Sequence, residues 1–198
     1  ADDEQLKKYL DVVDEEIERL NKIVVDFLFA VRPFKFEFVP MDVNALVRSL
    51  AEFMGAELNA AGISLTLELA DGLPLIMGDD RFLRQMLINL VKNAMGAMPS
   101  GGTIHMSTQA TEDGVTMTLE DSGVGIPADM INRIFEPYFT TKADGTGLGL
   151  TMAYKVVKEH GGDIRVQSEP GNGTCFTIQL PMMRRAKKLI EYEESGDS

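Results

Sequence analysis

The chain has 198 residues, of which 44% are hydrophobic, and its 19 basic and 31 acidic residues give a formal net charge of -12. This length and composition fit one globular domain with a buried core plus an accessory element. The acidic excess opposes a phosphate backbone and excludes nucleic acid as a general partner. The sequence has no run of about 18 apolar residues, so we expect neither a membrane span nor membrane contact by this segment.

The first predicted element is a long amphipathic helix over residues 1–32. Apolar residues recur in alternating steps of four and three from Leu6 to Val31, which is a heptad pattern. Such a helix would extend roughly 40 Å, too far to pack fully on a small domain. Its wide apolar stripe predicts a helical bundle or a dimer, with a long core helix as the alternative. Arg32 precedes a proline, so the helix should end there.

A linker is predicted over residues 33–40, which contain two prolines and few helix signals. The second unit, residues 41–181, is predicted to hold helices over 43–61, 80–98 and 149–160, and strands over 63–69, 103–109, 115–120, 164–168 and 174–180. Because strands outnumber crossover helices, we expect an α+β fold, a two-layer sandwich of a mixed five-stranded sheet and about three helices. A charged tail over residues 182–198 is expected to be solvated.

Three single residues favour structural roles. Cys175 lies in an alternating run, which predicts a buried strand residue rather than a nucleophile. His105 lies in a predicted strand, and His160 lies at a predicted helix end, where the helix dipole favours it. The chain starts at Ala1 without a methionine or a signal segment, which is typical of part of a longer protein.

Two asparagines on the second predicted helix of the domain suggest a metal site. Asn89 and Asn93 are four residues apart and share a helix face, separate from the apolar face. Neutral amide oxygens suit a Mg²⁺ ion that also carries substrate phosphate oxygens. Taken alone, such a pair is more often solvent-facing.

An acidic glycine-rich loop follows a predicted strand at residues 121–126. Gly123 and Gly125 would let a planar ring approach the backbone, and the carboxylate of Asp121 can accept a hydrogen bond from an exocyclic amine. Adenine offers that donor, so the loop favours ATP over GTP. The ligand series of an EF-hand is absent, which excludes that calcium site.

A second glycine-rich loop at residues 145–150 precedes a predicted helix, whose first amides can face phosphates. It does not match the Walker pattern, since Leu150 and Thr151 follow Gly149, and the spacing also differs from the dinucleotide fingerprint. Residues 135–142 between the two loops are irregular and include Lys142, which predicts a mobile lid over phosphates.

In order and spacing, these motifs resemble the catalytic, ATP-binding domain of bacterial sensor histidine kinases of the GHKL superfamily. Residues 89–94 resemble the N box, 121–126 the first glycine box, 135–142 the F box, 145–150 the second glycine box, and 171–174 with Phe176 the last glycine motif. The resemblance covers about residues 41–181. The heptad helix resembles the second helix of the dimerisation and phosphoacceptor hairpin.

The resemblance implies the GHKL fold, ATP and Mg²⁺ as cofactors, and a cytoplasmic location. Asn93 would bind Mg²⁺ with help from Asn89, Asp121 would hold the adenine amine, and Leu148 and Phe139 are candidates for gripping the hairpin. The full set of implied ATP-binding residues is Asn89, Lys92, Asn93, Asp121, Gly123, Gly125, Ile126, Tyr138, Thr141, Lys142, Gly145, Thr146, Gly147, Leu148, Gly149, Leu150 and Thr174.

By the same resemblance, Asn89 stands where hydrolytic relatives carry a glutamate that activates water, so we expect phosphoryl transfer to a histidine and slow ATP hydrolysis. The acceptor motif, a histidine followed by an acidic residue, is absent and should lie before residue 1. The implied partners are the phosphoacceptor hairpin of the same kinase, a response-regulator receiver domain and, in the full-length protein, a second copy. A non-catalytic, nucleotide-dependent interaction module and a GHKL ATPase clamp are the alternatives.

Overall fold

The computed structural model describes residues 35–142 and 145–183. The heptad helix predicted over residues 1–32 and most of the predicted charged tail lie outside this part of the chain. Among the described residues, no helix is both long enough and apolar enough to cross a bilayer.

The predicted helices and strands are all present, in the predicted order, and their boundaries differ from the prediction by at most one residue. The helices are α2 (Val43–Ala60), α3 (Asp80–Ala97), α4 (Ala128–Ile131) and α5 (Gly149–Glu159). The strands are β1 (Val39–Met41), β2 (Ile63–Leu69), β3 (Ile76–Gly78), β4 (Gly102–Ala110), β5 (Gly114–Asp121), β6 (Asp163–Ser168) and β7 (Thr174–Pro181).

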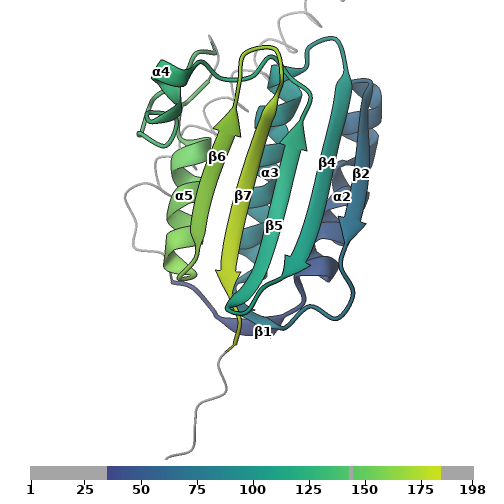
Figure 1. Ribbon diagram of the computed structural model, residues 1–198, viewed down its shortest axis with the longest axis vertical. Helices are drawn as coiled ribbons and strands as arrows, with labels where there is room; N and C mark the ends of the chain where they lie inside the picture. The colour runs from purple at the N-terminus through teal and green to yellow at the C-terminus, as the bar shows by residue number, and fades with distance from the viewer. Residues whose placement is uncertain (1–34, 143–144, 184–198) are drawn as a thin grey trace, which may run out of the picture.

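The main sheet has five strands in the order β2-β4-β5-β7-β6. Strands β2 and β4 run parallel, whereas the β4–β5, β5–β7 and β6–β7 pairs are antiparallel. Helices α2, α3 and α5 lie together behind this sheet (Figure 1). The predicted α+β sandwich with a mixed five-stranded sheet is therefore confirmed.

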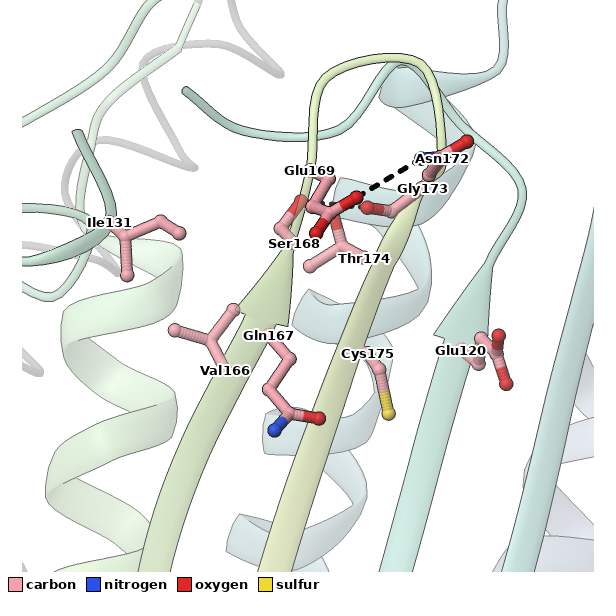
Figure 2. A pocket seen from close by; sticks show the side chains of 10 residues that line it. All are labelled: Glu120, Ile131, Val166, Gln167, Ser168, Glu169, Asn172, Gly173, Thr174 and Cys175. Atoms are coloured by element: carbon pink, nitrogen blue, oxygen red, sulfur yellow. Dashed lines mark hydrogen bonds between the residues drawn. The ribbon is translucent and has the colours of Figure 1, made fainter. Parts of the chain in front are cut away.

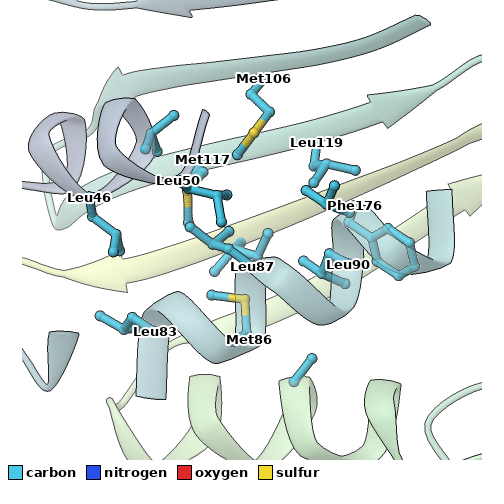
Figure 3. Close-up of a cluster of buried hydrophobic side chains, with 14 of the residues drawn as sticks. Leu46, Leu50, Leu83, Met86, Leu87, Leu90, Met106, Met117, Leu119 and Phe176 are labelled. Carbon is cyan, nitrogen blue, oxygen red and sulfur yellow. The ribbon is translucent and has the colours of Figure 1, made fainter. Parts of the chain in front are cut away.

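The hydrophobic core fills the space between the sheet and these helices (Figure 3). Leu83, Met86, Leu87 and Leu90 on α3 are almost fully buried, because they recur at helical spacing and face the sheet. Alternate residues of β4 and β5, such as Met106, point to the same side. Within residues 35–142 and 145–183, no helix covers the opposite face of the sheet, whose residues are mostly polar.

Helix α3 positions the candidate site because it runs from one end of the sheet to the other (Figure 1). Its start is capped by Asp79, whose side chain accepts a hydrogen bond from the Arg81 backbone nitrogen at 3.1 Å. Asn89 and Asn93 are half-buried and lie off the fully buried face. The glycine-rich loops lie around the C-terminal half of this helix.

Three short elements, the strands β1 and β3 and the helix α4, were absent from the sequence prediction. The short strand β1 overlaps the end of the predicted linker and pairs antiparallel with β3, with Pro40 opposite Met77. Helix α4 lies between the first glycine-rich loop and the predicted lid, where no element was predicted. The segment before α2 is thus attached to the domain by backbone pairing, whereas the domain boundary near residue 40 stays a prediction.

Candidate functional site

The side chain of Asn89 links α3 to the second glycine-rich loop. Its Nδ2 donates to the carbonyl oxygen of Gly149 at 3.3 Å and lies 3.4 Å from Sδ of Met152. Its Oδ1 accepts from Nε2 of Gln85 at 3.2 Å. Two motifs that are 60 residues apart in sequence therefore meet at one amide.

Asp121 ends β5 as a buried carboxylate, with 4% of its surface exposed. Its Oδ1 accepts a hydrogen bond from the Gly123 backbone nitrogen at 2.9 Å. Burial raises the pKa of this carboxyl, although the backbone N–H groups of Gly123 and Thr174 and the charge of Lys142 act in the opposite direction. The carboxylate is held in a fixed position beside β7, where Thr174 is its cross-strand partner.

The first glycine-rich loop packs directly on the end of α3. The Val124 nitrogen donates to the carbonyl oxygen of Ala97 at 3.1 Å, and a Cβ at position 123 would lie 2.7 Å from the Ala97 Cβ. Gly125 has a φ of +72°, and a side chain there would overlap the backbone of Glu169. Position 123 thus requires glycine because α3 approaches closely. Position 125 requires it because of both its positive φ and the close backbone of Glu169.

Ser168 at the end of β6 joins the first loop to β7, a role that sequence reasoning missed. Its Oγ accepts from the Ile126 nitrogen at 2.8 Å and donates to the Gly173 carbonyl at 2.7 Å. The same Oγ lies 3.0 Å from Oγ1 of Thr174. No local sequence signal identifies this residue, because its partners belong to two other segments.

The predicted lid is tied to the second glycine-rich loop. The Tyr138 nitrogen donates to the Gly147 carbonyl at 3.0 Å, and both residues have positive φ angles, 66° and 68°. The end of the Lys142 side chain lies over Gly96 of α3, where a Cβ would overlap it. The lid cation is therefore placed beside α3 and acts electrostatically on Asp121.

The structure brings most of the predicted nucleotide residues around one end of α3, but not all of them by their side chains. Lys92, Tyr138 and Thr141 are exposed, Thr146 is half-buried, and Ile126 and Leu150 pack partly against the core. Leu148 is 5% exposed. In this arrangement Leu148 is buried, and its role in gripping the hairpin stays a prediction.

Phe139, the other residue expected to grip a helical hairpin, is half-buried against the core. The guanidinium carbon of Arg133 lies 4.5 Å from the centre of its ring. Part of this aromatic surface is thus already covered by the domain itself.

The donor set fits a magnesium ion only when a ligand supplies further oxygens. In the described ranges, no group of three or more His, Cys, Asp or Glu side chains could hold a metal ion. Asn89 and Asn93 offer neutral amide oxygens, and the Asn89 amide already contacts α5. This chemistry matches a cation that arrives with phosphate oxygens.

Both histidines are placed in structural settings. His160 is 6% exposed, its Nε2 accepts from the Asp79 nitrogen at 3.0 Å, and its Nδ1 donates to the Val156 carbonyl at 2.7 Å. His160 is the C-cap residue of α5, as its predicted place at a helix end implies, and burial lowers its pKa. His105 lies on the helix-free face of the sheet, 3.0 Å from Thr66 Oγ1 and 3.4 Å from a carboxylate oxygen of Glu68.

Cys175 differs from the expectation of a buried strand residue. It is half-buried and points to the helix-free face, because the neighbouring residues Thr174 and Phe176 occupy the buried face. Burial nevertheless raises the pKa of its thiol. A raised pKa disfavours the thiolate and agrees with the expectation that it is no nucleophile.

A hollow at the end of β6 and β7 lies beside the predicted site (Figure 2). Of the predicted nucleotide residues, only Thr174 lines it, together with Ser168, Gly173 and residues that face the other side of the sheet. The hollow is therefore adjacent to the glycine-rich loops and is not the space between α3, α5 and the lid.

Comparisons with known proteins agree with this arrangement. A family model described as "Histidine kinase-, DNA gyrase B-, and HSP90-like ATPase" matches residues 78–184. Sporulation kinase E of Bacillus subtilis (strain 168) is 36% identical over 181 residues, which are 91% of this chain and 24% of that protein. The chain spans only about a quarter to two fifths of the length of the curated relatives it matches.

Solved histidine kinase structures share the fold. Full-length ShkA in complex with AMPPNP matches with a TM-score of 0.79 and 28% identity, over 90% of this chain and 39% of that one. The catalytic domain of ThkA, in a nucleotide-free form, matches with a TM-score of 0.68 and 32% identity, over 75% of this chain and 99% of that one. ThkA in complex with the response regulator TrrA matches with a TM-score of 0.76 and 30% identity, over 90% of this chain and 52% of that one.

The match to the family model spans more than half of the chain, and the chain covers almost all of a solved histidine kinase catalytic domain at 32% identity. Both findings fall on the part of the structure in which the glycine-rich loops converge on α3. The chain therefore belongs to the histidine kinase-, DNA gyrase B- and HSP90-like ATPase family, and this domain is the ATP-binding catalytic domain of a histidine kinase.

Proposed function

We propose that this domain binds Mg-ATP between α3, the two glycine-rich loops and the lid, and transfers the γ-phosphoryl group to a histidine of a helical hairpin. The observation that carries the proposal is convergence: motifs from four separate segments meet around the C-terminal half of α3. Asn89 contacts Gly149, Lys142 lies over Gly96, and Val124 binds the carbonyl of Ala97.

The proposal assigns the base end of the nucleotide to Asp121 and Thr174, which are cross-strand partners. The carboxylate would accept from the adenine amine. The phosphates would lie toward the start of α5, whose cap residue Leu148 makes no side-chain hydrogen bond to the helix. The first amides of that helix would face the anionic ligand, and the positive end of the helix dipole would add attraction.

Lys92 and Lys142 would lie near the phosphates, and Asn93 with Asn89 would hold the magnesium ion. The ion supplies charge neutralisation for the transferred phosphoryl group when it is bound. The protein contributes positioning: the amide of Asn89 is fixed between Gln85 and Gly149. The lid is positioned by the backbone bond between Tyr138 and Gly147.

Helix α3 offers no carboxylate that could activate water next to the proposed phosphates. From Arg81 to Ala97 its sequence contains no acidic residue, and the amide of Asn89 is a weak base. We therefore propose slow hydrolysis and efficient transfer to a nitrogen nucleophile. A ring nitrogen of the acceptor histidine attacks the γ-phosphorus, the bond to the bridging oxygen breaks, and ADP leaves.

The acceptor histidine must come from outside this chain, because its two histidines are unsuitable. His160 is buried with both ring nitrogens bonded, and His105 lies on the far face of the sheet from α3. We propose that the phosphoacceptor hairpin of the same kinase supplies this histidine. We also propose that the full-length protein is a homodimer and is cytoplasmic. A receiver domain is the proposed next partner, supported by the solved complex of ThkA with its response regulator.

The test is transfer in trans. The chain is mixed with Mg-ATP labelled at the γ-phosphate and with a folded hairpin that carries the acceptor histidine. We expect acid-labile, alkali-stable label on the hairpin, and none on a control hairpin in which that histidine is replaced by Gln. Repeated ATP turnover without the hairpin would instead support an ATPase clamp.

An interaction module without catalysis is the second candidate, because the lid is coupled to the second loop by the Tyr138–Gly147 bond. Nucleotide binding at that loop would then order the lid for a partner. Hydrogen exchange of lid amides with and without a non-hydrolysable ATP analogue checks this. Unchanged protection together with label on the hairpin would leave kinase activity as the sole function.

A further inference from the structure

The hydroxyl of Ser168 lies at the centre of a small hydrogen-bond network behind the base end of the proposed site (Figure 2). Its Oγ is 2.8 Å from the nitrogen of Ile126, 2.7 Å from the carbonyl oxygen of Gly173 and 3.0 Å from Oγ1 of Thr174. One side-chain oxygen thereby connects the first glycine-rich loop with the start of β7.

Counting hydrogens fixes the direction of each bond in this network. A hydroxyl has one hydrogen and two acceptor lone pairs. The nitrogen of Ile126 can only donate and the carbonyl of Gly173 can only accept, so the single hydrogen of Ser168 is used on Gly173. The remaining lone pair must accept from Thr174, whose own hydrogen therefore points at Ser168.

Thr174 is left as an acceptor toward everything else. It is 5% exposed and lies opposite Asp121, which is 4% exposed, on the buried face of the β5–β7 pair. Side chains of such directly opposed residues have Cβ atoms about 5 Å apart. An ionised carboxylate also only accepts. The two side chains together present acceptors and no donor.

We propose that Ser168 is a positioning residue that makes this site select a purine with an amine, rather than a carbonyl, at its 6-position. The inference rests on the proposed function, because it takes the base to lie against Asp121. The adenine amine has two hydrogens to donate, whereas hypoxanthine carries a carbonyl at the same ring position. Without Ser168, the Thr174 hydroxyl can rotate and donate to that carbonyl.

The experiment is a calorimetric titration of the chain with Mg-ATP and Mg-ITP, for the wild type, Ser168→Ala and Ser168→Thr. We expect the wild type to prefer ATP, and Ser168→Ala to lower the ATP-over-ITP ratio by about fivefold, the equivalent of one net hydrogen bond. Ser168→Thr keeps the hydroxyl and should retain the wild-type ratio. If Ser168→Ala weakens both nucleotides equally, the residue is merely structural and the inference fails.

A second variant tests whether Ser168 acts through Thr174. In a Thr174→Val background the hydroxyl is gone, so adding Ser168→Ala should leave the ATP-over-ITP ratio unchanged; a further change would overturn the inference. Should Ser168→Ala unfold, as judged by circular dichroism, Ser168→Cys replaces it, because a thiol is a weak hydrogen-bond partner. Failure of the wild type to bind ATP would overturn the proposed function as well, whereas selective wild-type binding with an unaltered variant ratio overturns this inference alone.

Discussion

Two carboxylates at opposite ends of the molecule are almost equally buried but differ in their surroundings. Asp79 precedes α3 and is 2% exposed, and Asp121 ends β5 and is 4% exposed. In Figure 1, α3 starts at the lower end of the sheet near β1, whereas β5 ends at the upper end. Burial alone therefore does not distinguish a structural carboxylate from a binding one.

The difference lies in the donors that the protein supplies. Asp79 accepts from the Glu37 nitrogen at 2.9 Å and from the backbone and guanidinium of Arg81 at 3.0–3.3 Å. Burial would raise its pKa, but these bonds bring the value down to about 2. Asp121 receives no guanidinium in the described part of the chain, burial prevails, and its pKa is raised. The carboxylate with fewer donors is the one suited to a ligand that brings its own.

The largest effect is expected from Asp121→Asn. The change keeps the shape but replaces an acceptor with a mixed donor and acceptor, so ATP binding should weaken by about 1.5 to 3 kcal/mol, as for a hydrogen bond to a charged group. Calorimetric titration with a non-hydrolysable ATP analogue measures this. Unchanged affinity would place the adenine elsewhere.

The same variant should leave the fold intact at neutral pH. Because the pKa of Asp121 is raised in the folded state, its ionised form costs stability, and this cost grows as pH rises through the folded pKa. Asp121→Asn should therefore unfold at an equal or higher urea concentration at pH 7. Lower stability there would mean that Asp121 is structural like Asp79.

Asp79→Asn should give the opposite pattern. Asparagine still caps α3, but the charge-assisted bonds are lost, and the free energy of unfolding should fall by about 1 kcal/mol, since the Arg81 side chain is largely exposed and screened. ATP affinity should not change. A loss of affinity without a loss of stability would remove the contrast between the two ends.

The pH dependence sharpens this prediction. A carboxyl whose folded pKa is about 2 against 3.8 in the unfolded chain stabilises the fold above about pH 4, and this contribution is lost as pH falls from 4 to 2. Urea titrations across this range should give a smaller acid dependence for Asp79→Asn than for the wild type.

His160 predicts a pH effect at the same end of the molecule. Its neutral ring accepts from the Asp79 nitrogen, and the rings of Phe36 and Phe38 lie 5.4 and 5.0 Å away. Burial lowers its pKa, although Asp79 and Glu159 raise it. The unfolded chain takes up a proton near pH 6.5, so stability should fall as pH drops below that value.

The measurement compares the free energy of unfolding of the wild type and His160→Gln between pH 8 and 5. The difference between the two curves isolates this group from the carboxyls. A difference independent of pH would mean that the pKa of His160 is the same in the folded and in the unfolded chain, which would contradict this prediction.

The sequence sufficed for the elements that are long and periodic. Apolar residues of α3 recur at helical spacing, and those of the five main strands alternate with a period of two. Strands β1 and β3 have three residues each and α4 has four, too few for a period to emerge. Pro40 within β1 also opposed a strand.

For the candidate site, contiguous motifs were visible and contacts between segments were not. The glycines of both loops stand together in the sequence, whereas Ser168 acts on Ile126, 42 residues away. The setting of Cys175 was misjudged for a related reason: alternation reveals two strand faces but not which of them the helices cover. Only the folded structure shows that the glycine-rich loops and the lid lie around α3.

Cys175→Ser should have the smallest effect and serves as a control beside the site. Cys175 follows Thr174 directly, yet the strand turns its side chain to the helix-free face, away from Asp121. We expect less than about a twofold change in ATP affinity, and a change of about 0.5 kcal/mol in the free energy of unfolding, as for a substitution near the surface. Titration calorimetry and urea unfolding, run beside Thr174→Val, measure both. If the two neighbouring substitutions weakened ATP binding equally, affinity would depend on the strand as a whole and not on one of its faces. The distinction between an acceptor face and a solvated face of β7 would then be wrong.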